Sequence, residues 1–322
     1  MAESVETPQA AAVPFGHDDL LDTDTLSAEE IRFLLDQAES FAEVNERAVK
    51  KVPTLRGTTI MDCFFEPSTR TRSSFELAGK RLSADVINFS ASGSSLKKGE
   101  SLRDTALTLA AMGTDLIVVR HPAAGAAAYL ARELPIPVIN AGDGCHAHPT
   151  QALLDLFTLR RACGRLSGLT VAIVGDVAHS RVARSNLWAM RTLGIETRVC
   201  APPTLLPLEV ERYGCRVFHD LDAAVEGVDA IMVLRIQRER QGGRAFPSLR
   251  EYARRYCVTP RHVARAAPGC VVLHPGPINR GVEIADELAD GDPSLILQQV
   301  AAGVAVRMAV LYVLWSRATS AA

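Results

Sequence analysis

The sequence has no pair of cysteines at C-x-x-C spacing, although it contains seven cysteines in 322 residues. These cysteines are scattered, and several lie in apolar runs, where reduced thiols pack as small hydrophobic groups. Zinc ribbons and disulfide frameworks need closely spaced cysteines, so we expect neither. This cysteine usage favours a reducing compartment, and we expect the cytoplasm.

The sequence also lacks an excess of either charge, with 35 Lys+Arg against 37 Asp+Glu. Nucleic-acid and membrane-surface binding usually need a basic excess, so we expect neither partner. No signal peptide is expected, because the first residues are acidic and rich in Ala and Pro. The longest apolar run, Val300–Trp315, is interrupted by Arg307 and is shorter than the ~20 residues of a membrane span. We predict a buried helix there.

Two nucleotide-binding motifs are missing as well. The apolar run Val171–Gly175 ends in a single glycine, whereas a dinucleotide fold needs G-x-G-x-x-G after such a strand. No G-x-x-x-x-G-K-[ST] motif occurs, which excludes a P-loop kinase. We therefore expect no NAD and no other cofactor.

What the sequence does contain is a regular alternation of apolar strands and amphipathic helices from residue 58 onward. Such alternation predicts an α/β fold with mostly parallel sheets flanked by helices. The predicted strands cover residues 58–65, 85–89, 115–120, 137–140, 170–175, 197–200, 215–218, 230–234 and 270–273. We expect a flexible arm (1–22), a first domain (23–150 with 295–322), a second domain (151–294) and an active site in the cleft between the domains.

The chain is organised around the polar stretch that follows its first strand, from Phe64 to Glu76. Pro67 and Ser68 precede a helical pattern, so Ser68 is the expected N-cap. A helix start offers unpaired backbone N–H groups and a partial positive charge, and Ser68–Thr71 add three hydroxyls and the Arg70 guanidinium. This combination predicts a phosphate site.

Other polar residues follow other predicted strands. Ligands of open parallel sheets bind outside the carboxyl ends of the strands, so these clusters are expected to converge on one site. They are Arg120, the run Asp143–Gln151, Arg181, Arg235 with Gln237, and the turn His274–Pro277.

Two of these clusters have alternative interpretations. Cys145, His146 and His148 are zinc-ligand types, but their close spacing cannot converge on one ion without strain, and we expect no metal. Arg181 and Arg235 could form surface ion pairs. Two separated guanidinium groups also suit a ligand with two carboxylates.

The stretch Ser68–Arg72 followed by Ser74–Glu76 resembles the carbamoyl-phosphate signature of the carbamoyltransferases. From about Leu20 onward, the chain resembles the bacterial aspartate carbamoyltransferase family. The further matching residues are the run His148–Gln151, Arg181, Arg235-Ile236-Gln237 and the turn His274–Pro277. The resemblance implies transfer of the carbamoyl group of carbamoyl phosphate to the α-amine of L-aspartate, a step of pyrimidine synthesis.

The resemblance also implies a role for each matching residue. Carbamoyl phosphate would be bound by Ser68, Thr69, Arg70, Thr71, Ser95, Arg120, His148, Gln151, Gly276 and Pro277. L-Aspartate would be bound by Lys98, Arg181, Arg235 and Gln237. The catalytic residues would be Arg70, Thr71, Arg120 and His148. Gly276 replaces the leucine of some relatives, but a main-chain contact survives that change.

Taken alone, the sequence around Ser95 and Lys98 indicates an exposed loop. In the family the matching loop reaches into the site of a neighbouring chain, so the resemblance implies a homotrimer with shared active sites. The run Ile278–Ile284 and the arm resemble bacterial chains that assemble with a dihydroorotase-like partner, and a regulatory partner chain is an alternative.

Two other functions stay open. Ornithine carbamoyltransferase shares the phosphate signature, but a cationic substrate needs an acidic or amide-rich pocket and a His-Cys-Leu-Pro turn. A catalytically silent scaffold would bind carbamoyl phosphate without turning it over.

Overall fold

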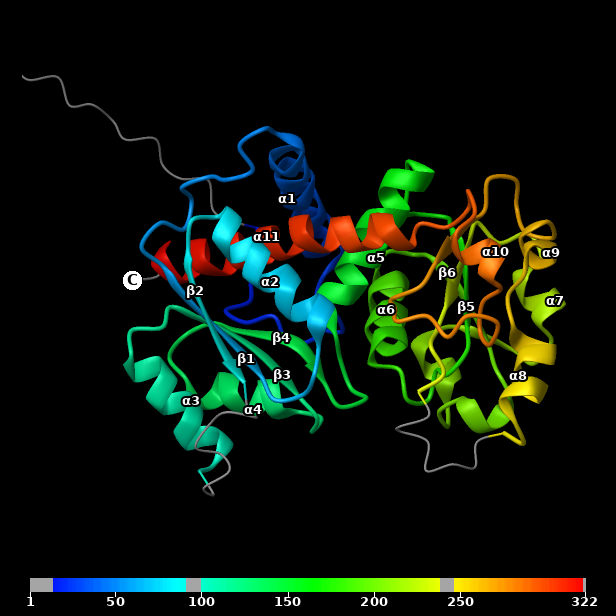
Figure 1. Cartoon of the computed structure of the whole chain (residues 1–322), viewed down its shortest axis with the longest axis horizontal. Helices are drawn as coiled ribbons and strands as arrows, with labels where there is room; N and C mark the ends of the chain where they lie inside the picture. The colour runs from blue at the N-terminus through cyan, green and yellow to red at the C-terminus, as the bar shows by residue number, and fades with distance from the viewer. Residues whose placement is uncertain (1–13, 91–99, 238–245, 321–322) are drawn as a thin grey trace, which may run out of the picture.

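The structure is a computed structural model that describes residues 14–90, 100–237 and 246–320. Two predicted site residues, Ser95 and Lys98, lie outside the described residues. The chain forms two parallel sheets that lie side by side, each flanked by helices (Figure 1). The predicted fold class is therefore confirmed.

The first sheet has the strand order β2-β1-β3-β4, and all its pairings are parallel. Strand β1, in the interior of the sheet, is buried on both faces: its residues Ile60 and Phe64 join one core cluster, and Met61 and Cys63 join another. A continuous apolar run is what a strand covered on both sides requires. The strands are β1 (Thr59–Phe64), β2 (Asp85–Ser90), β3 (Leu116–His121) and β4 (Val138–Asp143).

Helices cover both faces of this sheet. The helix after Ser27 begins with the capping box expected from its sequence, in which Ser27 and Glu30 satisfy each other's backbone N–H groups. The helices of this half are α1 (Ala28–Glu46), α2 (Thr69–Arg81), α3 (Leu102–Ala111), α4 (Ala126–Glu133) and α5 (Pro149–Cys163). Figure 1 shows α3 and α4 on one side of the sheet, and α1 and α2 on the other.

The second sheet has the order β7-β6-β5-β8-β9, again with parallel pairings. Its strands are β5 (Thr170–Val174), β6 (Glu196–Cys200), β7 (Arg216–Phe218), β8 (Ala230–Val233) and β9 (Val271–Leu273). Its helices are α6 (Arg181–Thr192), α7 (Leu221–Val225), α8 (Leu249–Tyr256), α9 (Pro260–Val263) and α10 (Asp286–Ala289), with short 3-10 turns η3 (Pro203–Leu205) and η4 (Val210–Tyr213).

The last helix, α11 (Ile296–Ser320), starts beside the second sheet and runs back across the first half, where it packs on α1, α2 and α5 (Figure 1). Its 25 residues are long and apolar enough to cross a membrane, so the prediction that this segment is too short was wrong. Burial of 67% of its most apolar stretch inside the structure is typical of a core helix. The predicted buried helix is thus confirmed, and it extends further than expected.

Residues 14–22, assigned to the arm from the sequence, pack against the first half. Phe15 and Leu20 are buried, and the Leu20 backbone pairs with β4 on either side of Ile139. These apolar contacts explain why the described part of the arm does not extend away from the body. We propose a first domain of residues 23–150 with 295–322 and a second domain of residues 151–294, so that α5 begins in the first domain and continues into the second.

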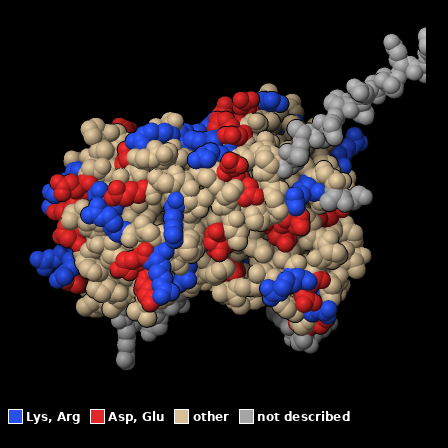
Figure 2. Space-filling model, turned by 180° about the vertical axis from the view of Figure 1, so that it is seen from behind, with Lys and Arg blue, Asp and Glu red and all other residues tan. Residues whose placement is uncertain are grey.

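On the face seen from behind in Figure 2, basic and acidic side chains are interspersed. This pattern agrees with the balanced charge of the sequence.

Candidate active site

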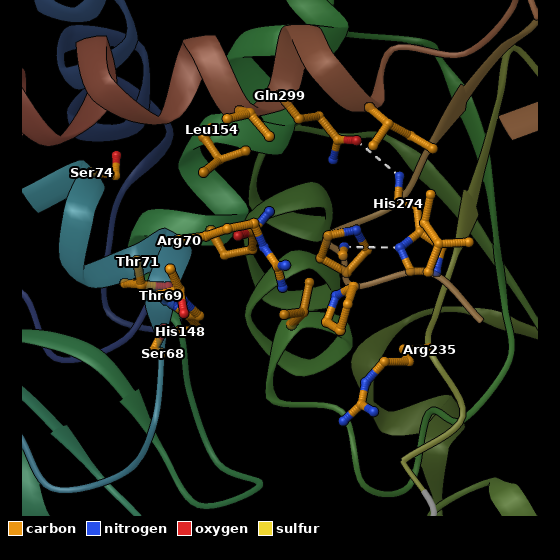
Figure 3. A pocket seen from close by; sticks show the side chains of 18 of the residues that line it. Ser68, Thr69, Arg70, Thr71, Ser74, His148, Leu154, Arg235, His274 and Gln299 are labelled. Carbon is orange, nitrogen blue, oxygen red and sulfur yellow. Dashed lines mark hydrogen bonds between the residues drawn. The ribbon is translucent and has the colours of Figure 1, made fainter. Parts of the chain in front are cut away.

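A cavity of about 1000 Å³ lies between the two sheets. Figure 3 places Ser68–Thr71 and His148 at one side of this pocket, and Arg235 and His274 at the other. The structure brings together every predicted site residue that it describes: Ser68, Thr69, Arg70, Thr71, Arg120, His148, Gln151, Arg181, Arg235, Gln237, Gly276 and Pro277 all line the cavity.

The charge of the cavity lining is strongly positive. Its arginines are Arg70, Arg120, Arg181, Arg235, Arg280 and Arg307, and the only acidic residue that lines it in the described part of the chain is Glu66. Such a lining suits substrates that together carry several negative charges.

The start of α2 forms the first wall. Ser68 occupies the N-cap position, as predicted, but its side chain makes no capping hydrogen bond. Its hydroxyl can therefore serve a ligand beside the first N–H groups of the helix. Arg70 packs against the turn after β9, because Gly276, at φ +64°, has no side chain; a Cβ there would lie 3.2 Å from the Arg70 Cζ. Glycine at this position thus allows close approach of the guanidinium.

Glu66 joins the two halves of the site. Its Oε1 accepts a hydrogen bond from Arg120 Nε at 2.7 Å and another from Arg181 Nη2. Arg120 also points Nη1 at Thr71 Oγ1, 3.3 Å away. Arg181 donates to the Gly144 carbonyl at 3.2 Å, and it passes Gly142, where a Cβ would lie 2.9 Å from its Cζ. One carboxylate therefore orients two arginines that reach the cavity from β3 of the first half and from the start of α6 of the second half.

His148 is buried at the start of α5, and its backbone N–H donates to Ser185 Oγ at 3.0 Å. Burial holds the pKa of its imidazole well below the usual value, and the charges of Arg120, Arg181 and Arg307 lower that pKa further. The ring is therefore neutral at neutral pH, and a neutral imidazole can donate one hydrogen bond without bringing a proton to the reaction.

The second sheet supplies the opposite wall. Arg235 follows β8, and its charge adds to burial in lowering the pKa of Arg70. Gln237 donates from Nε2 to the His179 carbonyl at 3.2 Å, and from its backbone to Asp176 at 3.4 Å.

The turn His274–Pro277 is fixed at three points. The His274 N–H donates to Gln299 Oε1 at 2.8 Å, and the Gly276 N–H donates to His274 Nδ1 at 2.8 Å (Figure 3). His274 Nε2 lies 3.3 Å from Glu283 Oε1, and both side chains are fully buried. The carbonyls of this turn are therefore held at the cavity edge.

Two family models cover almost the whole chain. The model described as aspartate/ornithine carbamoyltransferase, carbamoyl-P binding domain, matches residues 18–161, and the Asp/Orn binding domain of the same family matches residues 167–314. The chain belongs to the aspartate/ornithine carbamoyltransferase family.

Similar sequences narrow the branch of this carbamoyltransferase family. The chain is 57% identical to the aspartate carbamoyltransferase catalytic subunit of Syntrophotalea carbinolica, over 92% of this chain and 95% of the relative. It is 58% identical to the catalytic subunit of Nitratidesulfovibrio vulgaris, over 94% and 95%. It therefore groups with bacterial aspartate carbamoyltransferase catalytic subunits.

Solved structures share the fold. Aspartate transcarbamoylase from Trypanosoma cruzi, in complex with N-(phosphonacetyl)-L-aspartic acid, has a TM-score of 0.83 at 30% identity, over 91% of this chain and 94% of that one. Ornithine carbamoyltransferase from Thermus thermophilus has a TM-score of 0.82 at 29% identity, over 92% and 99%. Because both carbamoyltransferases fit equally well, the backbone alone does not separate the two substrates.

Sequence reasoning gave no role to several residues of this carbamoyltransferase site. Glu66 lies in the polar stretch Phe64–Glu76, two residues before the phosphate signature, and an acid among arginines at a strand end was the available signal. Arg307 was noticed as a break in an apolar run, and that isolated charge was its signal. Asp155 and Gln299 carried no motif and emerge only from the fold.

No group of three or more His, Cys, Asp and Glu side chains that could hold a metal ion occurs within residues 14–90, 100–237 and 246–320. The seven cysteines are all free thiols.

Proposed function

We propose that the chain transfers the carbamoyl group of carbamoyl phosphate to the α-amine of L-aspartate, giving N-carbamoyl-L-aspartate and phosphate for pyrimidine synthesis. The observation that carries this proposal is the pair Arg181 and Arg235, which line one cavity with the helix start Ser68–Thr71. A phosphate cradle beside two further guanidinium groups matches one phosphorylated substrate and one dicarboxylic substrate.

The roles follow from position and charge. The α2 start and Arg120 would hold the phosphate, and Gln151 and the carbonyls of Gly276 and Pro277 would accept from the carbamoyl NH2. Arg181 would hold the α-carboxylate of aspartate. Arg235, with Gln237 on the same segment, would hold the side-chain carboxylate.

The chemistry needs no covalent enzyme intermediate. The uncharged amine of aspartate attacks the carbamoyl carbon, a C–N bond forms, and the C–O bond to phosphate breaks. Thr71, Arg120 and the neutral His148 would stabilise the oxyanion that develops, as prepositioned donors do. The amine proton passes to an oxygen of the departing phosphate. Holding both substrates in line supplies much of the rate.

Ornithine is the second candidate, and charge argues against it. Its side-chain ammonium would meet Arg70, whose pKa is lowered by burial and further by the charge of Arg235, and Arg235 itself. Like charges in a partly buried site cost several kcal/mol of binding energy.

Equilibrium binding tests this assignment. N-(phosphonacetyl)-L-aspartate carries a phosphonate and two carboxylates, and we expect it to bind at least ~100-fold more tightly than phosphate or aspartate alone, because one molecule spans both walls. The matched control, N-(phosphonacetyl)-L-ornithine, should lose most of that gain. Equal affinity for the two compounds would contradict the dicarboxylate assignment.

We further propose that the chain works in the cytoplasm as a homotrimer, in which Ser95 and Lys98 of one chain complete the site of its neighbour. The name catalytic subunit, carried by the similar chains, is compatible with a further regulatory or dihydroorotase-like partner.

Mixing inactive Arg70→Ala and Lys98→Ala chains in equal amounts tests whether active sites are shared between chains. Random trimers should regain about one quarter of the wild-type activity, since half the chains supply each intact residue. No recovery after confirmed mixing would exclude shared sites.

A further inference from the structure

Asp155, in the middle of α5, is fully buried and lies just behind the cavity wall. Its carboxylate accepts hydrogen bonds from three side-chain amides. Gln151 and Gln299 both donate to Oδ1, at 2.9 and 2.7 Å, and Asn186 donates to Oδ2 at 2.8 Å. The amides come from α5, α11 and α6, so one carboxylate ties three helices together.

The charge of Asp155 fixes how these amides are turned. Burial raises the pKa of its carboxyl to about 6, while the three amides and the charge of Arg307 act in the opposite direction. At neutral pH the group is ionised and can only accept hydrogen bonds. Each amide must therefore present its nitrogen to Asp155 and its oxygen elsewhere.

This orientation decides what the cavity offers to a ligand. Because Gln151 commits its nitrogen to Asp155 and lines the cavity, its oxygen is the atom left to accept from a ligand. Gln299 commits its nitrogen likewise, and its oxygen accepts the backbone N–H of His274 at 2.8 Å (Figure 3). Asp155 thus supports a side-chain acceptor and also the turn that carries the main-chain acceptors.

We propose that Asp155 is a positioning residue that makes this wall of the cavity an acceptor surface for an NH2 group, and so lets the site distinguish a carbamoyl from an acyl group. The inference rests on the proposed function, since it assigns the recognition of the carbamoyl NH2 to Gln151 and the turn His274–Pro277. Asp155 itself touches no reacting atom.

The experiment compares carbamoyl phosphate with acetyl phosphate, which carries a methyl group in place of the NH2. Inorganic phosphate serves as a probe of the α2 wall alone. We expect the wild-type chain to favour carbamoyl phosphate, and Asp155→Leu to lower the ratio of the two affinities about tenfold or more, which corresponds to about one hydrogen bond. Phosphate affinity should stay within about twofold, since the α2 wall is untouched.

Two matched variants separate positioning from packing. Asp155→Asn keeps an oxygen that can serve both glutamines. Its new NH2 can donate to the Asn186 Oδ1, which has no partner among the described residues, once the Asn186 amide turns over. This variant should retain most of the preference. Asn186→Leu removes only the third hydrogen-bond donor to Asp155 and should also retain the preference for carbamoyl phosphate.

In steady state, Asp155→Leu should lower kcat by about 10–100-fold and leave the KM for aspartate within about threefold.

The outcomes are separable. If Asp155→Leu binds phosphate normally and keeps the wild-type preference for carbamoyl phosphate, the inference is overturned. If Asp155→Leu does not fold, Gln299→Met decides, because it removes the link to His274 and should lower the preference at least about threefold; an unchanged ratio overturns the inference. If the wild-type chain forms no carbamoyl aspartate, the proposed function fails first and the inference fails with it.

Discussion

At the scale of single residues, the site is a set of cations and amides arranged by two carboxylates, the fully buried Asp155 and the partly buried Glu66. Glu66 turns Arg120 and Arg181 toward the cavity, and Asp155 turns two glutamine amides. The cations were predictable, because arginines after apolar strands stand out in a sequence. The contacts of Asp155 were not predictable, because Asp155 and Gln299 are 144 residues apart and meet only in the fold.

Arg70 is the first residue to test. Arg70→Ala should lower kcat by at least about 10³-fold, since it removes a charged donor from the site where the leaving phosphate gathers charge. Arg72→Ala is the matched control, because Arg72 is exposed on the same helix and does not line the cavity. Steady-state rates with both substrates saturating give the comparison. Near-normal turnover in a folded Arg70→Ala chain would remove the phosphate role.

The lowered pKa of His148 predicts that the stability of the fold depends on pH. Its pKa in the folded chain is far below 6.5, while in the unfolded chain it is near 6.5. Below pH 6.5 the unfolded state therefore binds a proton that the folded state does not, and stability is lost as the pH falls, by up to about 1.4 kcal/mol per pH unit. Urea unfolding of the wild type and His148→Gln at pH 7.5 and 5.5 measures this. The wild type should lose more stability than the variant, and equal losses would mean an ordinary His148 pKa.

At the scale of elements, α2 and α11 meet beneath the phosphate wall. Arg307 of α11 is buried, donates to Ser74 Oγ at 2.9 Å and lies over the Phe75 ring at 5.1 Å. Burial lowers its pKa to about 10, while Asp155 and Asp62 act to raise it. The Arg307 charge therefore acts on two buried carboxyl groups, of which Asp155 is ionised at neutral pH and Asp62, with a pKa raised by burial to about 8, is protonated.

Arg307→Met should therefore destabilise the fold by about 3–5 kcal/mol, because it removes the buried hydrogen bonds to Ser74 and Gly303 and the positive charge that acts on the buried, ionised Asp155. Arg161→Met on α5 is the control, since that side chain is 45% exposed and a surface ion pair contributes about 0–1 kcal/mol. The free energy of unfolding from denaturant titration gives both values. Equal effects of the two substitutions would show that Arg307 carries no special share of stability.

The elements themselves were largely predictable. All nine strands of residues 14–90, 100–237 and 246–320 were expected near their observed positions, because buried parallel strands are short apolar runs bounded by turn residues. The differences are at the ends: α11 extends to Ser320, and residues 14–22, predicted as part of a flexible arm, pack against the first half. Both depend on contacts with distant elements, for which local periodicity gives no signal.

At the scale of the whole molecule, two similar α/β halves place a phosphate cradle beside a pair of carboxylate-binding arginines. The fold is common to aspartate and ornithine carbamoyltransferases, so the substrate is decided by the charges that line the cavity. The sequence predicted Arg70, Arg120, Arg181 and Arg235 in this lining, because each lies at or after the end of a predicted strand, and parallel strands end at one edge of their sheet. Arg280 and Arg307 also line the cavity but were not predicted.

The most direct test of the account is ureido-product formation by the purified chain from carbamoyl phosphate, with L-aspartate and L-ornithine offered separately. The arrangement of Arg181 and Arg235 predicts product with aspartate and at least ~10³-fold less with ornithine, because the cationic side chain meets arginines in place of acids. Product with ornithine alone would contradict the account. Binding of carbamoyl phosphate without product from either amine would show a silent scaffold and would contradict it as well.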